Sequence, residues 1–115
     1  MLQKKYRLKK HSAFIATYRI NNTKSDKNVC IFFGKEKKDE NIPTKFAFVV
    51  SKKIHKRAVV RNRIKRLMRE SVRKFLLTQE YSHLHKYLSI ICVAKHSAID
   101  KTYEDINNSL TTLLK

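Results

Sequence analysis

Hydrophobic positions along this chain recur at two different spacings, which predict helices and strands. The strongest helical pattern runs from Ala58 to about Thr78, where apolar residues recur every three or four positions and form one stripe. The stripe consists of Val60, Ile64, Leu67, Met68 and Phe75. Basic residues fall on the side opposite this stripe, at Arg61, Lys65, Arg66, Arg69 and Arg73, so this helix is expected to bury one side and to expose a cationic one.

Two further helices are predicted, one near each end of the chain. The first spans about His11 to Arg19, with Ser12 placed to cap it. The other spans about Lys101 to Leu114, and its Thr102 and Asp105 have the spacing of a capping box. Each carries an apolar side that requires a partner surface.

Three short runs rich in β-branched and aromatic residues predict strands. These runs are Val29 to Phe33, Lys45 to Ser51 and Tyr87 to Lys95. The last is almost continuously apolar, which is typical of a strand covered on both faces. The polar stretches Asn21 to Asn28 and Lys35 to Thr44 are interpreted as loops, the charged part of the second as an exposed hairpin loop. The order helix, strands, helix, strand, helix predicts a two-layer α+β sandwich that forms one domain over residues 1–115.

The net charge of the chain indicates a domain that binds a polyanion. The chain has 115 residues with 27 Lys and Arg against 9 Asp and Glu, a formal net charge of +18. Nucleic acid is the expected partner, because neutralised phosphates release condensed counterions and so favour binding. No apolar run reaches the length of a membrane-spanning helix, and no apolar signal core follows the basic N-terminus. We therefore expect a cytoplasmic protein without a membrane partner.

The basic side of the long helix is the main candidate for RNA contact. Glu70 is the only acid between Ile54 and Thr78, whereas a solvated face normally mixes both signs. Arginine suits phosphate because its planar fork can bond two oxygens at once. The candidate residues on this helix are Arg61, Asn62, Arg63, Lys65, Arg66, Arg69 and Arg73. Lys52 and Lys53 precede the helix and are expected to extend the basic surface.

Aromatic residues give a second candidate site. Phe14, Tyr18 and Phe32 fit either a core or a surface that stacks unpaired bases, and periodicity leaves both interpretations open. No catalytic or metal site is predicted, because the five histidines are scattered and the acids are few. Cys30 and Cys92 lie in strand-like runs and are expected to be buried free thiols. An enzyme that works on its own is therefore not expected.

Two blocks of the sequence resemble the bacterial ribonuclease P protein subunit. They are Phe48-Val-Val-Ser-Lys-Lys-Ile and Ala58-Val-Val-Arg-Asn-Arg-Ile-Lys-Arg-Leu-Met-Arg-Glu, with the hallmark Arg-Asn-Arg at 61–63. The similarity extends to the opening around Arg7 to Lys10, to the run Ile90 to Lys95 and to the segment that begins at Tyr103. The chain departs from the family at Ala47 and His55, where the family often has glycine.

The resemblance implies a four-stranded sheet and three helices in the order α-β-β-β-α-β-α, as in domain 2 of ribosomal protein S5, with a left-handed βαβ crossover. It implies a subunit of an endoribonuclease that removes the 5′ leader of precursor tRNA. In such an enzyme a catalytic RNA holds the active site and the Mg²⁺, and the protein binds no cofactor of its own.

The resemblance also assigns roles to individual positions. Those that match the surface docking on the catalytic RNA are Arg61, Asn62, Arg63, Lys65, Arg66 and Arg69. Those that match the cleft for the single-stranded leader of precursor tRNA are Phe14, Tyr18, Phe32, Lys52 and Lys53. Both RNAs are therefore expected partners.

Three alternatives share some of these features. A ribosomal or ribosome-associated RNA-binding protein would have the same size, charge and basic helix, but not the two blocks at this spacing. A DNA-binding module would also present a basic helix, but here one side of that helix is committed to the core, so DNA is not expected. A stand-alone nuclease would have to cleave without any RNA component.

Overall fold

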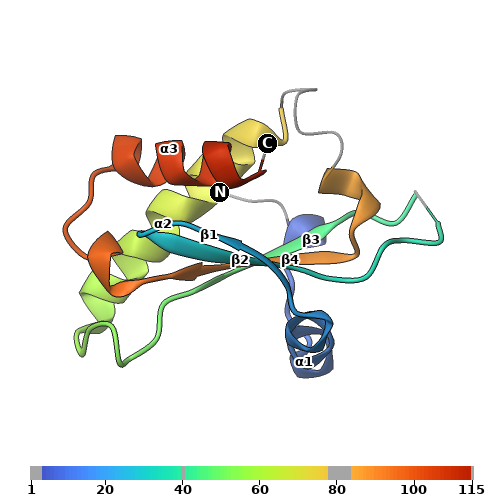
Figure 1. The fold of residues 1–115 in the computed structure, drawn as a ribbon, viewed down its shortest axis with the longest axis horizontal. Helices are drawn as coiled ribbons and strands as arrows, with labels where there is room; N and C mark the ends of the chain where they lie inside the picture. The colour runs from blue at the N-terminus through green and yellow to red at the C-terminus, as the bar shows by residue number, and fades with distance from the viewer. Residues whose placement is uncertain (1–3, 40, 78–83, 115) are drawn as a thin grey trace.

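A computed structural model describes residues 4–39, 41–77 and 84–114. Within these residues four strands and three α-helices follow one another in the order α-β-β-β-α-β-α (Figure 1), as expected from the resemblance. The helices are α1 (His11–Ile20), α2 (Ala58–Phe75) and α3 (Tyr103–Leu114), and the strands are β1 (Asn22–Ser25), β2 (Val29–Phe33), β3 (Lys45–Val49) and β4 (Ser89–Ala94). Short 3-10 turns lie at Lys4–Tyr6 and His96–Ala98.

The four strands form one mixed sheet in the order β1-β2-β4-β3. β2 pairs antiparallel with both β1 and β4, whereas β3 pairs parallel with β4. The prediction that the last strand is covered on both faces is confirmed, because β4 lies inside the sheet and five of its six residues are buried. The β3–α2–β4 connection joins two neighbouring parallel strands, and its left-handed sense stays a prediction from the resemblance.

Two predictions about loops are wrong. The polar stretch Asn21 to Asn28 contains β1, an edge strand whose four residues are all exposed and therefore lack the apolar alternation of a half-buried strand. The charged part of the second stretch, Glu36 to Glu40, is not a hairpin loop between neighbouring strands, because β4 lies between β2 and β3. Instead Glu36 forms an isolated bridge with Tyr87, beside the start of β4.

The predicted caps had different outcomes. Ser12 does not cap α1, because the helix begins one residue earlier, at His11, and has no side-chain cap. The capping box of α3 is confirmed: the Thr102 backbone N–H donates to the Asp105 carboxylate at 3.2 Å, and the Asp105 N–H donates to Thr102 Oγ1 at 3.2 Å. α2 ends at Phe75, and its predicted end at Thr78 lies outside the described residues.

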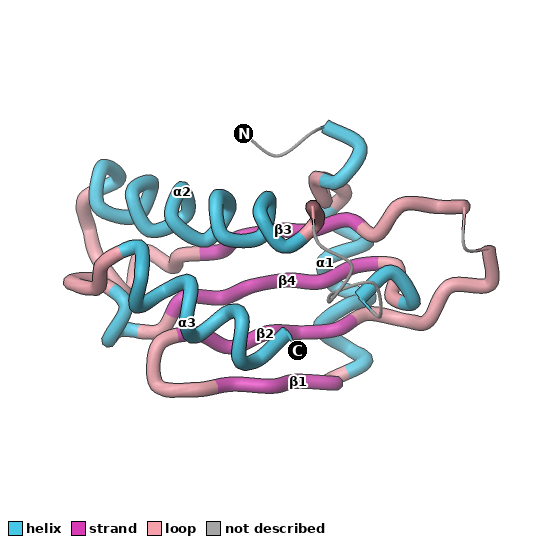
Figure 2. Tube along the Cα trace, turned by 90° about the horizontal axis from the view of Figure 1, so that it is seen from above, coloured by secondary structure: helices cyan, strands magenta, loops and turns pink. Residues whose placement is uncertain are grey.

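The helices cover the sheet unequally. α2 and α3 lie side by side over one face, whereas α1 lies against the other face near one end of the sheet (Figures 1 and 2). The hydrophobic core lies between the sheet and the two helices α2 and α3. The helices contribute Ile64, Met68, Val72, Ile106 and Leu110 to it. The alternation of β2 sends Val29, Ile31 and Phe33 into this core and leaves Cys30 and Phe32 on the α1 side.

Close contacts fix the position of α1 on the sheet. The hydroxyl groups of Thr17 in α1 and Ser89 in β4 form a buried hydrogen bond of 2.5 Å. Gly34, the only glycine, passes beside the same serine, and a Cβ atom there would lie 2.3 Å from Ser89 Oγ. The chain therefore has no room for a side chain at the point where β2 leaves the sheet.

Candidate nucleic-acid interface

The cationic side of α2 lies at the surface, but Arg61, Lys65, Arg69 and Arg73 are half-buried. Asn62, Arg63 and Arg66 are exposed, and with Val59 and Val60 they line a surface hollow of about 560 Å³. α2 is positioned there because its opposite side carries the buried residues that contact the sheet and α3. The helix therefore holds a row of polar and guanidinium groups at the surface without any contribution from a flexible loop.

Arg61 is bonded to the segment that precedes α2. One guanidinium nitrogen, Nη1, donates to the backbone carbonyls of His55 at 3.0 Å and Lys56 at 2.7 Å. In the same segment the Arg57 N–H donates to His55 Nδ1 at 3.1 Å. Arg61 thus fixes the connection between β3 and α2.

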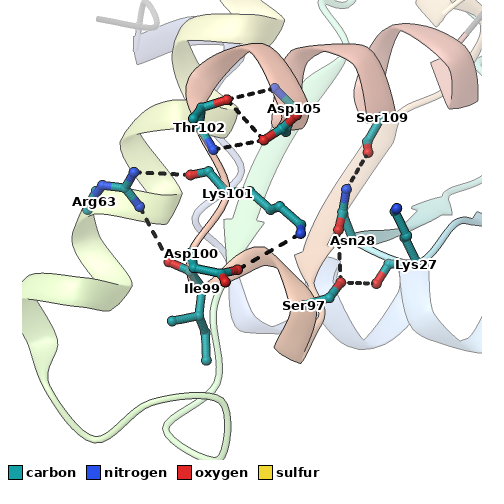
Figure 3. Close-up of polar contacts among 10 residues, drawn as sticks. All are labelled: Lys27, Asn28, Arg63, Ser97, Ile99, Asp100, Lys101, Thr102, Asp105 and Ser109. Atoms are coloured by element: carbon teal, nitrogen blue, oxygen red, sulfur yellow. Dashed lines mark hydrogen bonds and ion pairs between the residues drawn. The ribbon is translucent and has the colours of Figure 1, made fainter.

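Arg63 is bonded to the segment that precedes α3 (Figure 3). Its Nη2 donates to the Lys101 carbonyl at 3.0 Å, and its Nη1 lies 3.5 Å from the Ile99 carbonyl oxygen. The Lys101 carbonyl immediately precedes the capping box of α3, in which hydrogen bonds from Thr102 lower the pKa of Asp105. Arg63 therefore joins α2 to the start of α3.

The remaining cations of α2 differ from these two arginines. Arg73 forms an ion pair with Glu70 at 3.1 Å, and the hydrogen bond from Arg73 lowers the pKa of Glu70. Lys65, Arg66 and Arg69 make no hydrogen bond or ion pair with any described residue. We call Arg61 and Arg63 the anchored pair, and Lys65, Arg66 and Arg69 the outward group.

The sequence did not distinguish between these two groups. The carbonyls that hold Arg63 lie 36 and 38 residues away along the chain. No local pattern marks a backbone carbonyl as an acceptor for a distant side chain, so nothing in the sequence could have identified the contacts of Arg63.

The structure brings two of the three predicted aromatics together. The rings of Tyr18 and Phe32 make an edge-to-face contact with their centroids 4.9 Å apart. Tyr18 is 36% exposed and Phe32 is half-buried, so both remain accessible on the α1 side of the sheet. Burial raises the pKa of the Tyr18 hydroxyl, with a smaller contribution from Cys30. Phe14 is half-buried one helical turn before Tyr18 and lies on the same side of α1.

Lys52 and Lys53 lie apart from these aromatics. Both are exposed in the turn that follows β3. Val49, the last residue of β3, lies level with Cys30 of β2 across the sheet. Cys30 in turn lies two residues before Phe32 along β2. The lysines therefore extend beyond one end of the sheet face that carries Phe32, and among the described residues no hydrogen bond or ring contact joins them to the aromatic rings.

Residues 4–39, 41–77 and 84–114 contain no group of three or more His, Cys, Asp or Glu side chains placed to hold a metal ion. Within the same residues no helix is both long and apolar enough to cross a membrane.

Comparison with known families decides where the chain belongs. The family that matches is Ribonuclease P, whose model aligns with residues 2–115. This chain belongs to the ribonuclease P protein family. Among its relatives, the ribonuclease P protein component of Clostridium kluyveri is 34% identical over 110 residues, which are 96% of this chain and 92% of the relative. That of Staphylococcus carnosus is 35% identical over 116 residues, with coverage of 99% and 91%.

Solved structures of family members have the same fold. The ribonuclease P protein of Staphylococcus aureus is similar with a TM-score of 0.76 and 30% identity, and the match covers 95% of this chain and 92% of that one. The protein of Thermotoga maritima matches with a TM-score of 0.75 over 95% of this chain and 94% of that one. Its identity is 20%, so it supports the fold alone. The expected α+β fold and the expected family are both confirmed.

Proposed function

We propose that this protein is the RNA-binding subunit of a ribonuclease P holoenzyme, which removes the 5′ leader of precursor tRNA. The observation that carries the proposal is the outward group on α2. Lys65, Arg66 and Arg69 are three cations on a rigid helix with no described anionic partner, in a chain of net charge +18. Their most effective neutralisation comes from phosphates, because binding releases the condensed counterions of an RNA.

The proposed mechanism is indirect. The cations of α2 bind the catalytic RNA, and the Tyr18–Phe32 pair stacks an unpaired base of the leader. Phe14 extends this stacking surface, and Lys52 and Lys53 reduce the repulsion between the leader phosphates and those of the catalytic RNA. In this mechanism the catalytic centre and its Mg²⁺ belong to the RNA subunit, and the side chains of this protein contribute charge neutralisation and stacking.

The test is cleavage of a precursor tRNA at low magnesium by a bacterial ribonuclease P RNA. Wild-type protein is expected to rescue cleavage, and an Arg66→Ala/Arg69→Ala variant is expected to lose most of the rescue. A matched control, Lys24→Ala/Lys38→Ala, removes two exposed cations that lie outside α2 and should rescue like the wild type. If the wild type binds RNA but never changes the cleavage rate, a ribosome-associated role replaces this proposal.

The leader site has its own test. Tyr18→Ala should weaken binding of precursor tRNA to the holoenzyme by about five- to a hundredfold, since stacking of one base on an aromatic ring contributes about 1–3 kcal/mol. Tyr18→Phe keeps the ring and should bind nearly as well as the wild type. Mature tRNA, which has no leader, serves as the control ligand, and equal losses for both tRNAs would contradict the assignment.

A further inference from the structure

A cavity lies on the side of α1 that faces away from the aromatics. It encloses about 400 Å³, and Ala13 and Ala16 form its wall on the helix. Successive helical residues are about 100° apart, which places these alanines roughly 150° around the helix from the mean direction of Phe14 and Tyr18. α1 therefore separates this cavity from the Tyr18–Phe32 pair. We call the cavity and the hollow adjoining it the α1 groove.

The walls of the cavity are apolar. Leu8, Ile42 and Leu88 line it, and the side chains of Ile42 and Leu88 are 45% and 38% exposed. Its volume lies within the range of about 300–1,000 Å³ that is usual for small-ligand sites. The small side chains of Ala13 and Ala16 leave space for a flat group to approach the helix, so the shape and polarity suit a nucleobase.

The rim of the groove is positively charged. Lys35 and Lys45 border the cavity, and Lys45 also lines the adjoining hollow of about 360 Å³. The other charged residues of that hollow are Lys4, Arg7, Lys9 and Lys10. No acid among the described residues lines either part, so the groove combines an apolar floor with a cationic edge, as sites for single-stranded nucleic acid do.

A buried donor in the groove has no acceptor among the described residues. Arg7 Nε, in the adjoining hollow, is inaccessible to solvent and makes no hydrogen bond with any described residue. A buried donor without a partner is rare in folded proteins and costs about 1–3 kcal/mol. An anionic ligand in the hollow would give this donor an acceptor once the Arg7 side chain turns towards the ligand.

We propose that the α1 groove binds the leader of precursor tRNA beyond the nucleotides that reach Tyr18 and Phe32. A base enters the apolar cavity and its phosphates lie along Lys35 and Lys45. The path is short, since α1 is about 10 Å across and a strand leaving the aromatics can cross its exposed side at Ile15. The groove admits only unpaired RNA, because a paired base cannot enter a cavity. This inference rests on the proposed function and extends it to a second part of the same substrate.

Leader length provides the test. Precursor tRNAs are compared whose leaders end at the Tyr18 site or extend several nucleotides further, with the reconstituted holoenzyme. The wild type should bind the longer leader about tenfold more tightly, a typical contribution of one stacked base. Ile42→Glu and Lys45→Glu place a negative charge on exposed positions of the groove and should abolish this gain without affecting the short leader. Lys38→Glu makes the same charge change at an exposed position outside the groove and should retain the gain.

A second measurement does not depend on any variant. A photoreactive base in the distal leader should crosslink to the segments that contain Ile42 or Leu88 in the wild-type holoenzyme. Equal affinity of the wild type for both leaders, equal effects of Ile42→Glu on both, or crosslinks only elsewhere would each overturn the groove assignment. Failure of the proposed function is distinct: the wild type would then not rescue cleavage even of the short-leader substrate.

Discussion

The anchored pair and the outward group belong to the same helix and nearly the same stretch of sequence, yet their surroundings differ. Arg61 donates to backbone carbonyls of the segment before α2, and Arg63 donates to backbone carbonyls of the segment before α3. Arg66 and Arg69, one to two turns further along, contact no described hydrogen-bond acceptor. The position of a cation in a basic motif therefore does not determine its role, because some arginines hold the neighbouring backbone in place and others present their charge at the surface.

The difference has an energetic consequence for RNA binding. An anchored arginine must break or share its carbonyl hydrogen bonds before it can bind a phosphate, whereas an outward one exchanges only water. The outward group should therefore contribute more to affinity per residue. The anchored pair should contribute more to the stability of the segments that border α2.

The largest expected difference between the outward group and the anchored pair is in RNA affinity. Arg66→Ala/Arg69→Ala should weaken binding to ribonuclease P RNA by about ten- to a thousandfold, and should lower the dependence of log K on log salt by about two. Thermal stability should stay equal or rise, because the variant carries less self-repelling charge. Binding titrations over a range of salt concentrations measure both quantities, and an unchanged salt slope would exclude phosphate contact.

A smaller effect is expected on stability from the anchored pair. Arg63→Ala should lower the free energy of unfolding by about 1 kcal/mol, since it removes exposed hydrogen bonds from a charged donor to the Lys101 and Ile99 carbonyls. Urea unfolding measures the change, with Arg66→Ala as the matched control. The distinction between the two groups is contradicted if Arg63→Ala leaves the free energy of unfolding unchanged and lowers RNA affinity as much as Arg66→Ala does.

The smallest expected effect concerns the capping box next to the Arg63 contact. Hydrogen bonds from Thr102 lower the pKa of Asp105 in the folded state from 3.8. Its carboxylate therefore stabilises the fold above pH 3.8, and this contribution disappears as the pH falls through the lower folded pKa. Asp105→Asn should be less stable than the wild type at neutral pH, and the difference should narrow in acid. A difference that is constant from neutral pH down to acid would show that the charge of Asp105 plays no part.

Local patterns predicted the helices well and the sheet only in part. The stripe of α2 and the capping box of α3 are encoded in neighbouring residues, so both were found. β1 was missed because Asn22 to Ser25 are polar and exposed. An edge strand with polar residues on both faces has the same sequence pattern as a loop. The position of β4 between β2 and β3 depends on long-range pairing, which no local period specifies.

The candidate site divides in the same way. The charge of α2 could be predicted because it depends on composition and helical spacing alone. The contact of Tyr18 with Phe32 depends on how α1 crosses the sheet, which the Thr17–Ser89 hydrogen bond and the bare backbone at Gly34 help to fix. The residues are far apart in sequence, so periodicity could not decide between a core and a binding surface.

The two cysteines make the protein convenient for spectroscopic work without any redesign. Cys92 is fully buried in β4, and burial raises the pKa of its thiol to about 12, so it should resist alkylating dyes. Cys30 is only half-buried and lies on the same face of β2 as Phe32, close enough to influence Tyr18. A small fluorophore attached to Cys30 in the natural sequence would therefore report directly on whether the aromatic surface is occupied.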